Sequence, residues 1–181
     1  MYDAFVQRLI ARVQELTIGD GQKGVDLGPM ISHAAVEKVR TLLLDAVELG
    51  AQIRLGEIPK GTSQFVSPVI LTGGSQESKI WSTEIFGPVV SITPFDTDAE
   101  AIAMANDTSY GLAAYLFTES TTRAWRISEA LQFGMVGVNT GRISTAQAPF
   151  GGIKQSGMGR EGGRYGLEEY LQLKYHCHEL G

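Results

Sequence analysis

The chain has 181 residues, of which 43% are hydrophobic and 19% charged, with a formal net charge of −5. These values are typical of a globular protein with its own core. No cluster of Lys and Arg and no apolar run of about 18 residues occurs, so neither nucleic acid nor a membrane is an expected partner. The N-terminus lacks the pattern of a secretory signal, and the single cysteine, Cys177, permits no internal disulfide. We therefore expect a cytoplasmic protein, with the mitochondrial matrix as an alternative.

Two helices are predicted in the first 50 residues. Apolar residues at helical spacing run from Phe5 to Leu16, and the helix would begin almost at the first residue. Because no strand or loop precedes it, this start suggests a chain cut inside a larger fold, and a natural start is the alternative. The second helix would begin at a Ser32 cap and end at Gly50, where glycine accepts a left-handed conformation.

The segment from Val89 to Asn139 indicates the fold class. Residues 89–95 are β-branched and apolar, and residues 113–117 and 135–138 are short, largely apolar runs, so each segment predicts a short strand. Two helices are predicted between them: one would begin at the capping box Thr97-Asp98-Ala99-Glu100, and the other would follow Ser120. Strand, helix, strand, helix, strand with short connections predicts an α/β fold: a mainly parallel sheet with helices on both faces.

The rest of the chain is less regular. Residues 140–163 are rich in Gly, Ser and Thr and predict a long loop, which in a compact domain is usually functional or disordered. Beyond them, apolar and polar residues alternate from Leu171 to His178. This alternation predicts a half-buried strand at the C-terminus, over residues 171–181.

Two short motifs suggest chemistry that their surroundings do not support. Residues 157–162 match G-x-G-x-x-G, but too little chain follows them for the second parallel strand of a βαβ unit, so we favour a plain loop over a pyrophosphate site. His176, Cys177 and His178 would alternate between the two faces of a strand. A solvated strand is therefore favoured over a metal site, and Cys177 is not expected to be a nucleophile.

The segment Glu84-Ile85-Phe86-Gly87-Pro88-Val89 is more informative. In an extended chain, Glu84 and Phe86 would project to one side. A carboxylate can accept hydrogen bonds from both hydroxyls of a ribose, and an aromatic ring can pack beside a planar group. On spacing alone, however, a solvent-facing Glu84 with a core Phe86 is the simpler interpretation.

This segment resembles the cofactor-loop motif of the NAD(P)-dependent aldehyde dehydrogenase superfamily. Other segments resemble the same family in the same order, so that the resemblance covers essentially the whole chain. Within the superfamily, residues 143–162 and the ending Lys174-Tyr175-His176-Cys177 are most similar to succinate-semialdehyde dehydrogenases. The other matching segments are Leu27-Gly28-Pro29-Met30, Asn106-Asp107-Thr108-Ser109-Tyr110-Gly111-Leu112, Gly137-Val138-Asn139 and Pro149-Phe150-Gly151-Gly152-Ile153-Lys154-Gln155-Ser156-Gly157.

The resemblance implies roles for particular residues. Glu84 would hold the hydroxyls of the nicotinamide ribose, and Phe86 would pack beside the nicotinamide of NAD or NADP. Ser144, in the loop that lines the aldehyde tunnel, would donate a hydrogen bond to the distal carboxylate of a semialdehyde. Asn139 would hold the transition from strand to loop. Residues 171–181 would form the terminal strand of an oligomerisation sheet, so a homo-oligomer is expected.

The resemblance also implies what this chain lacks. Residues 1–170 would be part of the catalytic domain, because the family's nucleophilic Cys, general-base Glu and oxyanion Asn precede the position matching Met1. The chain alone is therefore expected to be inactive, with no catalytic residue of its own. The full-length parent would oxidise succinic or a similar short acidic semialdehyde. One departure is Arg142, at a loop position expected to be aliphatic. The alternative is a non-catalytic binding or assembly module.

Overall fold

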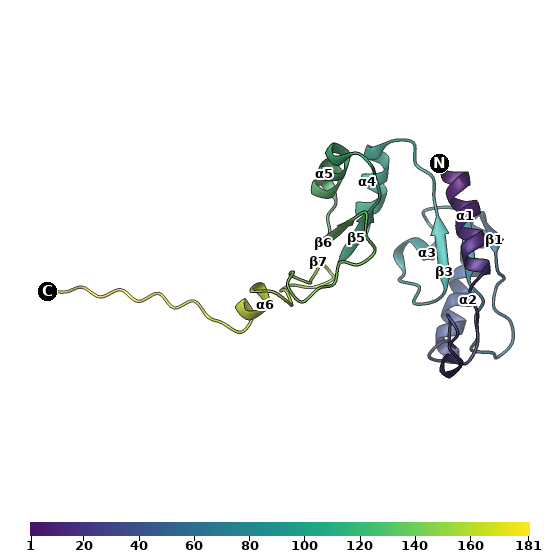
Figure 1. Cartoon of the computed structure of the whole chain (residues 1–181), viewed down its shortest axis with the longest axis horizontal. Coiled ribbons are helices and arrows are strands. Elements are labelled where there is room, and N and C mark those ends of the chain that lie inside the picture. Colours follow the sequence, from purple (N-terminus) through teal and green to yellow (C-terminus); the bar gives the residue numbers. More distant parts are fainter. The chain divides into compact units, whose positions relative to one another are not determined.

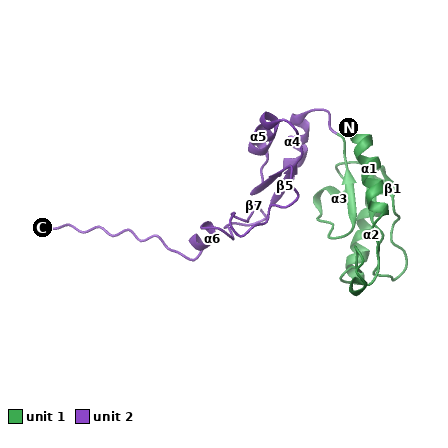
Figure 2. Ribbon diagram, in the orientation of Figure 1, with its two compact units in different colours: residues 1–94 green, residues 95–181 purple.

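A computed structural model describes the whole chain, residues 1–181, and divides it into two compact units, Met1–Pro94 and Phe95–Gly181 (Figures 1 and 2). Each unit is described by itself. No helix in either unit combines the length and apolar character needed to cross a bilayer.

Unit 1 contains a three-stranded sheet and the longest helices of the chain. The strand order is β1-β2-β3, with β1 antiparallel and β3 parallel to the central strand β2. The elements are α1 (Tyr2–Gln14), a 3-10 turn (Gly21–Lys23), α2 (His33–Glu48), β1 (Ala51–Leu55), β2 (Val69–Gly73), α3 (Lys79–Ser82) and β3 (Val89–Ile92).

The core of unit 1 lies between α2 and the sheet. Val36, Val39 and Leu43 form a buried stripe on α2 and share one cluster with Val69 and Leu71 of β2. The helix begins where the hydroxyl oxygen of Ser32 accepts a hydrogen bond from the Ala35 amide. These observations confirm the second predicted helix and its Ser32 cap.

Unit 2 contains a parallel crossover and an antiparallel pair of very short strands. Strand β5, helix α5 and strand β6 form a βαβ unit in which β5 and β6 pair in parallel. The predicted caps Thr97 and Ser120 accept hydrogen bonds from Glu100 and Arg123 amides. The elements are α4 (Asp98–Asn106), β4 (Tyr110–Gly111), β5 (Ala113–Leu116), α5 (Thr121–Ala130), β6 (Met135–Val138), β7 (Ile153–Lys154) and α6 (Tyr165–Glu168).

The structure confirms the α/β class with parallel sheet segments, but corrects one detail of the predicted topology. The first predicted strand, β3, pairs with β2 in unit 1, whereas β5 pairs only with β6. A single sheet through all three predicted strands is therefore not formed by this chain. The sequence analysis missed β2, a run with four consecutive buried residues that lacks the alternation used to recognise a half-exposed strand.

The C-terminal segment is a second difference. Residues 171–181 form no hydrogen-bonded strand within the chain and are exposed, and Figure 1 shows them as an extended tail. The alternating pattern needs a neighbouring strand before one face can be buried, and the chain supplies none here. Their pairing in an oligomer remains a prediction.

Candidate functional site

The loop from Thr83 to Pro88 connects α3 with β3 and presents the two predicted cofactor residues. Ile85 packs against the α2 core, while Glu84 and Phe86 on either side of it are exposed, Phe86 to 74%. The loop is not extended as the spacing argument assumed, because Phe86 has a left-handed φ of 48°. The interpretation of Phe86 as a core residue is thus wrong for this chain.

The carboxylate of Glu84 is free. It forms no hydrogen bond and no ion pair anywhere in the chain, and it is exposed. An unpaired carboxylate keeps all of its acceptor positions for a ligand, so it suits a vicinal diol that donates two hydrogen bonds. The exposed ring of Phe86, two residues on, offers an apolar face beside it.

The loop runs very close to α2 at Gly87. A Cβ atom added at Gly87 would lie 2.6 Å from Cγ2 of the buried Val39, closer than two carbon atoms can pack. Only glycine therefore fits between Phe86 and Pro88 while α2 keeps its place. This requirement gives a physical reason for the glycine in the motif.

Helix α3, directly before the loop, is fixed by Asp45 of α2. The Asp45 carboxylate accepts hydrogen bonds from the Ser78 hydroxyl and from the Lys79 amide, both at 2.8 Å. The Ser78 hydrogen bond, followed by the Lys79 amide, lowers the pKa of Asp45 below its ordinary value of 3.8. The ionised form of Asp45 is thus the form that holds the start of α3.

The predicted substrate residue lies in unit 2, after β6. The strand ends at Asn139, which has a left-handed φ of 55°. Its side chain accepts a hydrogen bond from the Thr118 amide at 2.8 Å and donates one to the Thr118 carbonyl at 2.9 Å. This reciprocal pair confirms that Asn139 holds the transition from strand to loop.

Ser144 stands in the exposed loop that follows. Ile143 packs over the backbone of β6, where a Cβ added at Gly137 would lie 2.8 Å from Cγ2 of Ile143. Arg142 and Ser144 flank this anchor and are both exposed. The Ser144 hydroxyl has no hydrogen-bond partner and the Arg142 guanidinium no carboxylate partner within the chain. One donor and one cation are therefore available to an anionic group.

The other motif segments of unit 2 pack against one another. Strands β4 and β7 pair Tyr110 with Lys154 and Gly111 with Ile153, and the Ser156 hydroxyl oxygen accepts a hydrogen bond from the Gly111 amide. The Lys154 ammonium donates to the carbonyl of Asn106 at 3.0 Å. These segments, more than 40 residues apart in sequence, are thus held together by hydrogen bonds.

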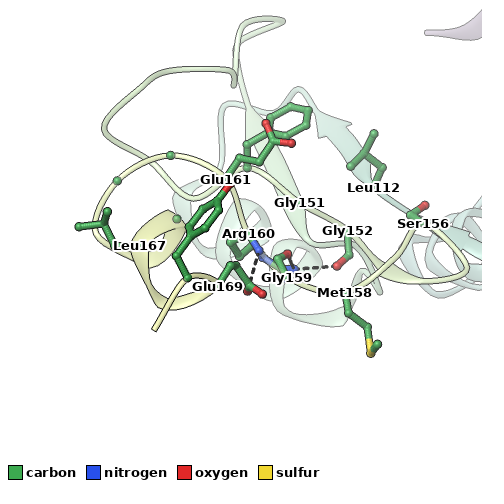
Figure 3. A pocket seen from close by; sticks show the side chains of 15 residues that line it. Leu112, Gly151, Gly152, Ser156, Met158, Gly159, Arg160, Glu161, Leu167 and Glu169 are labelled. Atoms are coloured by element: carbon green, nitrogen blue, oxygen red, sulfur yellow. Dashed lines mark hydrogen bonds between the residues drawn. The ribbon is translucent and has the colours of Figure 1, made fainter. Parts of the chain in front are cut away.

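A pocket of about 640 Å³ lies in unit 2, but it contains none of the residues assigned to cofactor or substrate (Figure 3). Among its lining residues, the Arg160 guanidinium donates to the carbonyls of Gly152 and Gly159, and the Arg160 amide donates to the Glu169 carboxylate. Two carboxylates, Glu161 and Glu169, also line it. Two carboxylates against one guanidinium that already donates to backbone carbonyls give the lining a net negative charge, which disfavours an anion such as pyrophosphate.

The glycines of the G-x-G-x-x-G segment have backbone roles instead. Gly157, Gly159 and Gly162 all have positive φ values, and no helix longer than the four-residue α6 follows them. A Cβ at Gly162 would lie 2.6 Å from the Ala148 carbonyl oxygen. The plain-loop interpretation is supported.

The C-terminal histidines and cysteine lie in the exposed tail. The rings of His176 and His178 are 5.0 Å apart, edge to face, and Cys177 is exposed. No group of three or more His, Cys, Asp or Glu side chains in the chain is arranged to hold a metal ion.

Comparison with known proteins agrees with the motifs. The sequence model of the aldehyde dehydrogenase family matches residues 1–176, so the chain belongs to this family. It is 49% identical over 98% of its length to the mitochondrial succinate-semialdehyde dehydrogenase of Oryza sativa subsp. japonica, of which it covers 34%. It is 46% identical over 98% of its length to a glutarate-semialdehyde dehydrogenase of Pseudomonas aeruginosa, of which it covers 37%. The chain thus spans about a third of the length of these relatives.

Solved structures give the same result. An Escherichia coli NADP-dependent enzyme superposes with a TM-score of 0.93 at 44% identity, over 99% of this chain and 38% of that chain. A betaine aldehyde dehydrogenase from Staphylococcus aureus, solved in complex with NAD+, superposes with a TM-score of 0.87 at 38% identity, over 94% and 35% of the two chains. Members of the family therefore use NAD or NADP.

The Asp45 contact predicts a pH dependence. A carboxylate whose folded-state pKa is lowered stabilises the fold above its ordinary pKa of 3.8, and this stabilisation is lost as pH falls through the folded-state pKa. We expect the free energy of unfolding, measured by urea titration between roughly pH 5 and pH 2, to fall more steeply for the natural chain than for Asp45→Asn.

The matched control is Glu77→Gln, which removes an exposed charge of the same sign beside α3 but none of these hydrogen bonds. It should keep the steep acid dependence of the natural chain. Equal slopes for Asp45→Asn and the natural chain would mean that Asp45 does not titrate as a partner of Ser78.

Proposed function

We propose that the chain is part of an NAD(P)-dependent enzyme that oxidises a short aldehyde with a distal carboxylate, such as succinic semialdehyde. The observation that carries this proposal is its identity of 46–49% to relatives named for succinate and glutarate semialdehydes. The free groups at the two loops support it. One loop offers an unpaired carboxylate and a ring, and the other a hydroxyl and a cation.

In this proposal, Glu84 and Phe86 bind the nicotinamide end of the cofactor. The Glu84 carboxylate accepts hydrogen bonds from the ribose hydroxyls, and the Phe86 ring packs beside the nicotinamide. The cofactor, when bound, supplies the acceptor of the hydride. The loop orients it, and orientation contributes to rate because hydride transfer needs the two reacting carbons in a narrow geometry.

Ser144 and Arg142 recognise the acidic end of the substrate. A serine hydroxyl donates one hydrogen bond to a carboxylate. A guanidinium donates two hydrogen bonds to it and adds a positive charge. Because Ile143 between them packs on β6, the backbone that carries both exposed side chains is held in place. A neutral aldehyde gains nothing from either group.

Assembly and location complete the proposal. Residues 171–181 carry an alternating apolar pattern and exposed backbone, which suits pairing with a strand of a second copy in a homo-oligomer. The expected location is the cytoplasm or the mitochondrial matrix, and the rice relative is named as mitochondrial.

The rival function is a non-catalytic binding or assembly module that reuses this part of the fold. The chain's single cysteine, Cys177, lies exposed in the tail and is not among the residues assigned to cofactor or substrate. The reading frame ahead of Met1 distinguishes the two. A continuation that carries a cysteine and a glutamate at the family's catalytic positions favours the enzyme, and a stop codon favours the module.

The chain alone is expected to be inactive. Oxidation of an aldehyde needs a thiolate, oxyanion donors and a base that activates water, and these are not among the residues assigned here. We expect no aldehyde-dependent reduction of NAD(P), and no measurable heat of NAD(P) binding in calorimetry of the 181-residue chain. Micromolar NAD binding to the chain would contradict this.

The substrate class is tested by Ser144→Ala in the full-length parent. A hydrogen bond to a charged group contributes about 1.5–3 kcal/mol, so kcat/KM for succinic semialdehyde should fall about ten- to a hundred-fold. Butanal, of equal chain length without the carboxylate, should be nearly unaffected. Steady-state kinetics with both aldehydes measure the difference.

Thr145→Val is a suitable control, because it removes the neighbouring hydroxyl, which donates to Gln147 rather than standing free. Thr145→Val should change kcat/KM for the two aldehydes by the same factor. If Ser144→Ala slows both aldehydes to the same extent, the serine only shapes the loop, and the proposal reduces to a general aldehyde dehydrogenase.

A further inference from the structure

Helix α2 holds the backbone of the Glu84–Phe86 loop directly. The Lys38 ammonium donates a hydrogen bond to the Glu84 carbonyl oxygen at 2.5 Å and lies 5.6 Å from the centre of the Phe86 ring. The first contact fixes the peptide that follows Glu84, and the second is a cation–π contact with the ring. One side chain thus touches both residues that would bind the cofactor.

The same helix holds the start of the segment through Asp45. Lys38 and Asp45 are about two helical turns apart and so lie on the same face of α2. Asp45 binds Ser78 and Lys79 at the N-terminus of α3, whereas Lys38 binds Glu84 beyond its C-terminus. The segment 78–86 is therefore tethered to α2 at both ends.

The loop needs this support because its own conformation is unfavourable. Phe86 has a left-handed φ of 48°, which a residue with a bulky side chain adopts only when its surroundings enforce it. Other anchors near it are Ile85, packed against the core, and Gly87, pressed against Val39 of α2. On the far side of Gly87, the Pro88 carbonyl accepts a hydrogen bond from the Val69 amide of β2 at 2.8 Å.

We propose that Lys38 and Asp45 are positioning residues: through them, α2 sets the position of the Glu84 carboxylate and the Phe86 ring. This proposal rests on the cofactor role proposed for that loop. Lys38 acts on the loop backbone and on the Phe86 ring, not on the substrate or the reacting atoms. Removal of the Lys38 ammonium should loosen the loop without unfolding unit 1, because an exposed contact of this kind adds little to global stability.

The first test measures the loop in the 181-residue chain itself. Order parameters of the Ile85, Phe86 and Gly87 amides, from ¹⁵N relaxation, should be near the rigid value of about 0.85 in the natural chain. In Lys38→Met they should fall toward about 0.6, because methionine keeps the length but not the donor or the charge. Lys38→Arg keeps both and should restore rigidity.

Lys23→Met is the matched control, since Lys23 is exposed in the same unit and touches neither loop nor ring. It should leave all three order parameters unchanged. The thermal midpoint of every variant should stay within a few degrees of that of the natural chain. Unchanged order parameters in Lys38→Met would overturn the proposal.

Asp45 gives an independent test at the other end of the segment. Asp45→Ala removes the acceptor of both hydrogen bonds, so the Lys79 and Ile80 amides should become mobile. Asp45→Asn retains an oxygen that can accept both and should have the smaller effect. Equal mobility of these amides in the alanine variant and the natural chain would overturn the role of Asp45.

A second measurement separates this proposal from the cofactor role of the loop. In the full-length parent, Lys38→Met should slow single-turnover hydride transfer roughly tenfold, with a smaller change in KM for NAD(P), and Lys38→Arg should recover most of the loss. A loosened loop with unchanged hydride transfer would support the tether but refute the cofactor role. A rigid loop with slowed transfer would refute the tether.

Discussion

The packing of helix α2 against the sheet of unit 1 is the interaction on which the candidate cofactor loop depends. One face of the helix is an apolar stripe, Val36, Val39 and Leu43, buried against strand β2. Close packing leaves so little room that Gly87 of the loop cannot carry a Cβ beside Val39. The neighbouring polar positions of the helix then reach the loop through Lys38 and α3 through Asp45. A core contact is in this way connected to the position of two exposed side chains.

The two candidate loops share one construction although they lie in different units. In each, an aliphatic residue packs inward and its two neighbours are exposed: Ile85 between Glu84 and Phe86, and Ile143 between Arg142 and Ser144. Each loop also includes or follows a residue with left-handed φ, Phe86 or Asn139. The anchor limits where the exposed groups can go, and the left-handed residue turns the chain. The Glu84 carboxylate, the Ser144 hydroxyl and the Arg142 guanidinium are thereby held on anchored loops while they stay unpaired within the chain.

Local features were the most predictable from sequence. The caps Ser32, Thr97 and Ser120 were identified correctly, because a side-chain acceptor three residues before an amide acts within one turn of chain. The cofactor and substrate roles of Glu84 and Ser144 followed only from the resemblance to a family, and these roles stay predictions. The tether could not be predicted, since Lys38 and Glu84 meet only after α2 and β3 join one core. The left-handed conformation of Phe86 could not be predicted either, because it comes from tertiary contacts rather than from the preference of phenylalanine.

The most direct test of this account is the rate of hydride transfer in the full-length parent carrying Glu84→Gln. Glutamine keeps the size of the side chain but loses the anionic acceptor, so the ribose would be held less firmly while distant cofactor contacts remain. The account predicts that single-turnover hydride transfer slows by roughly tenfold or more, while the Kd for NAD(P) changes much less. Glu77→Gln, an exposed site before the loop, should behave like the natural enzyme. An unchanged rate of hydride transfer in Glu84→Gln would contradict the role of this loop.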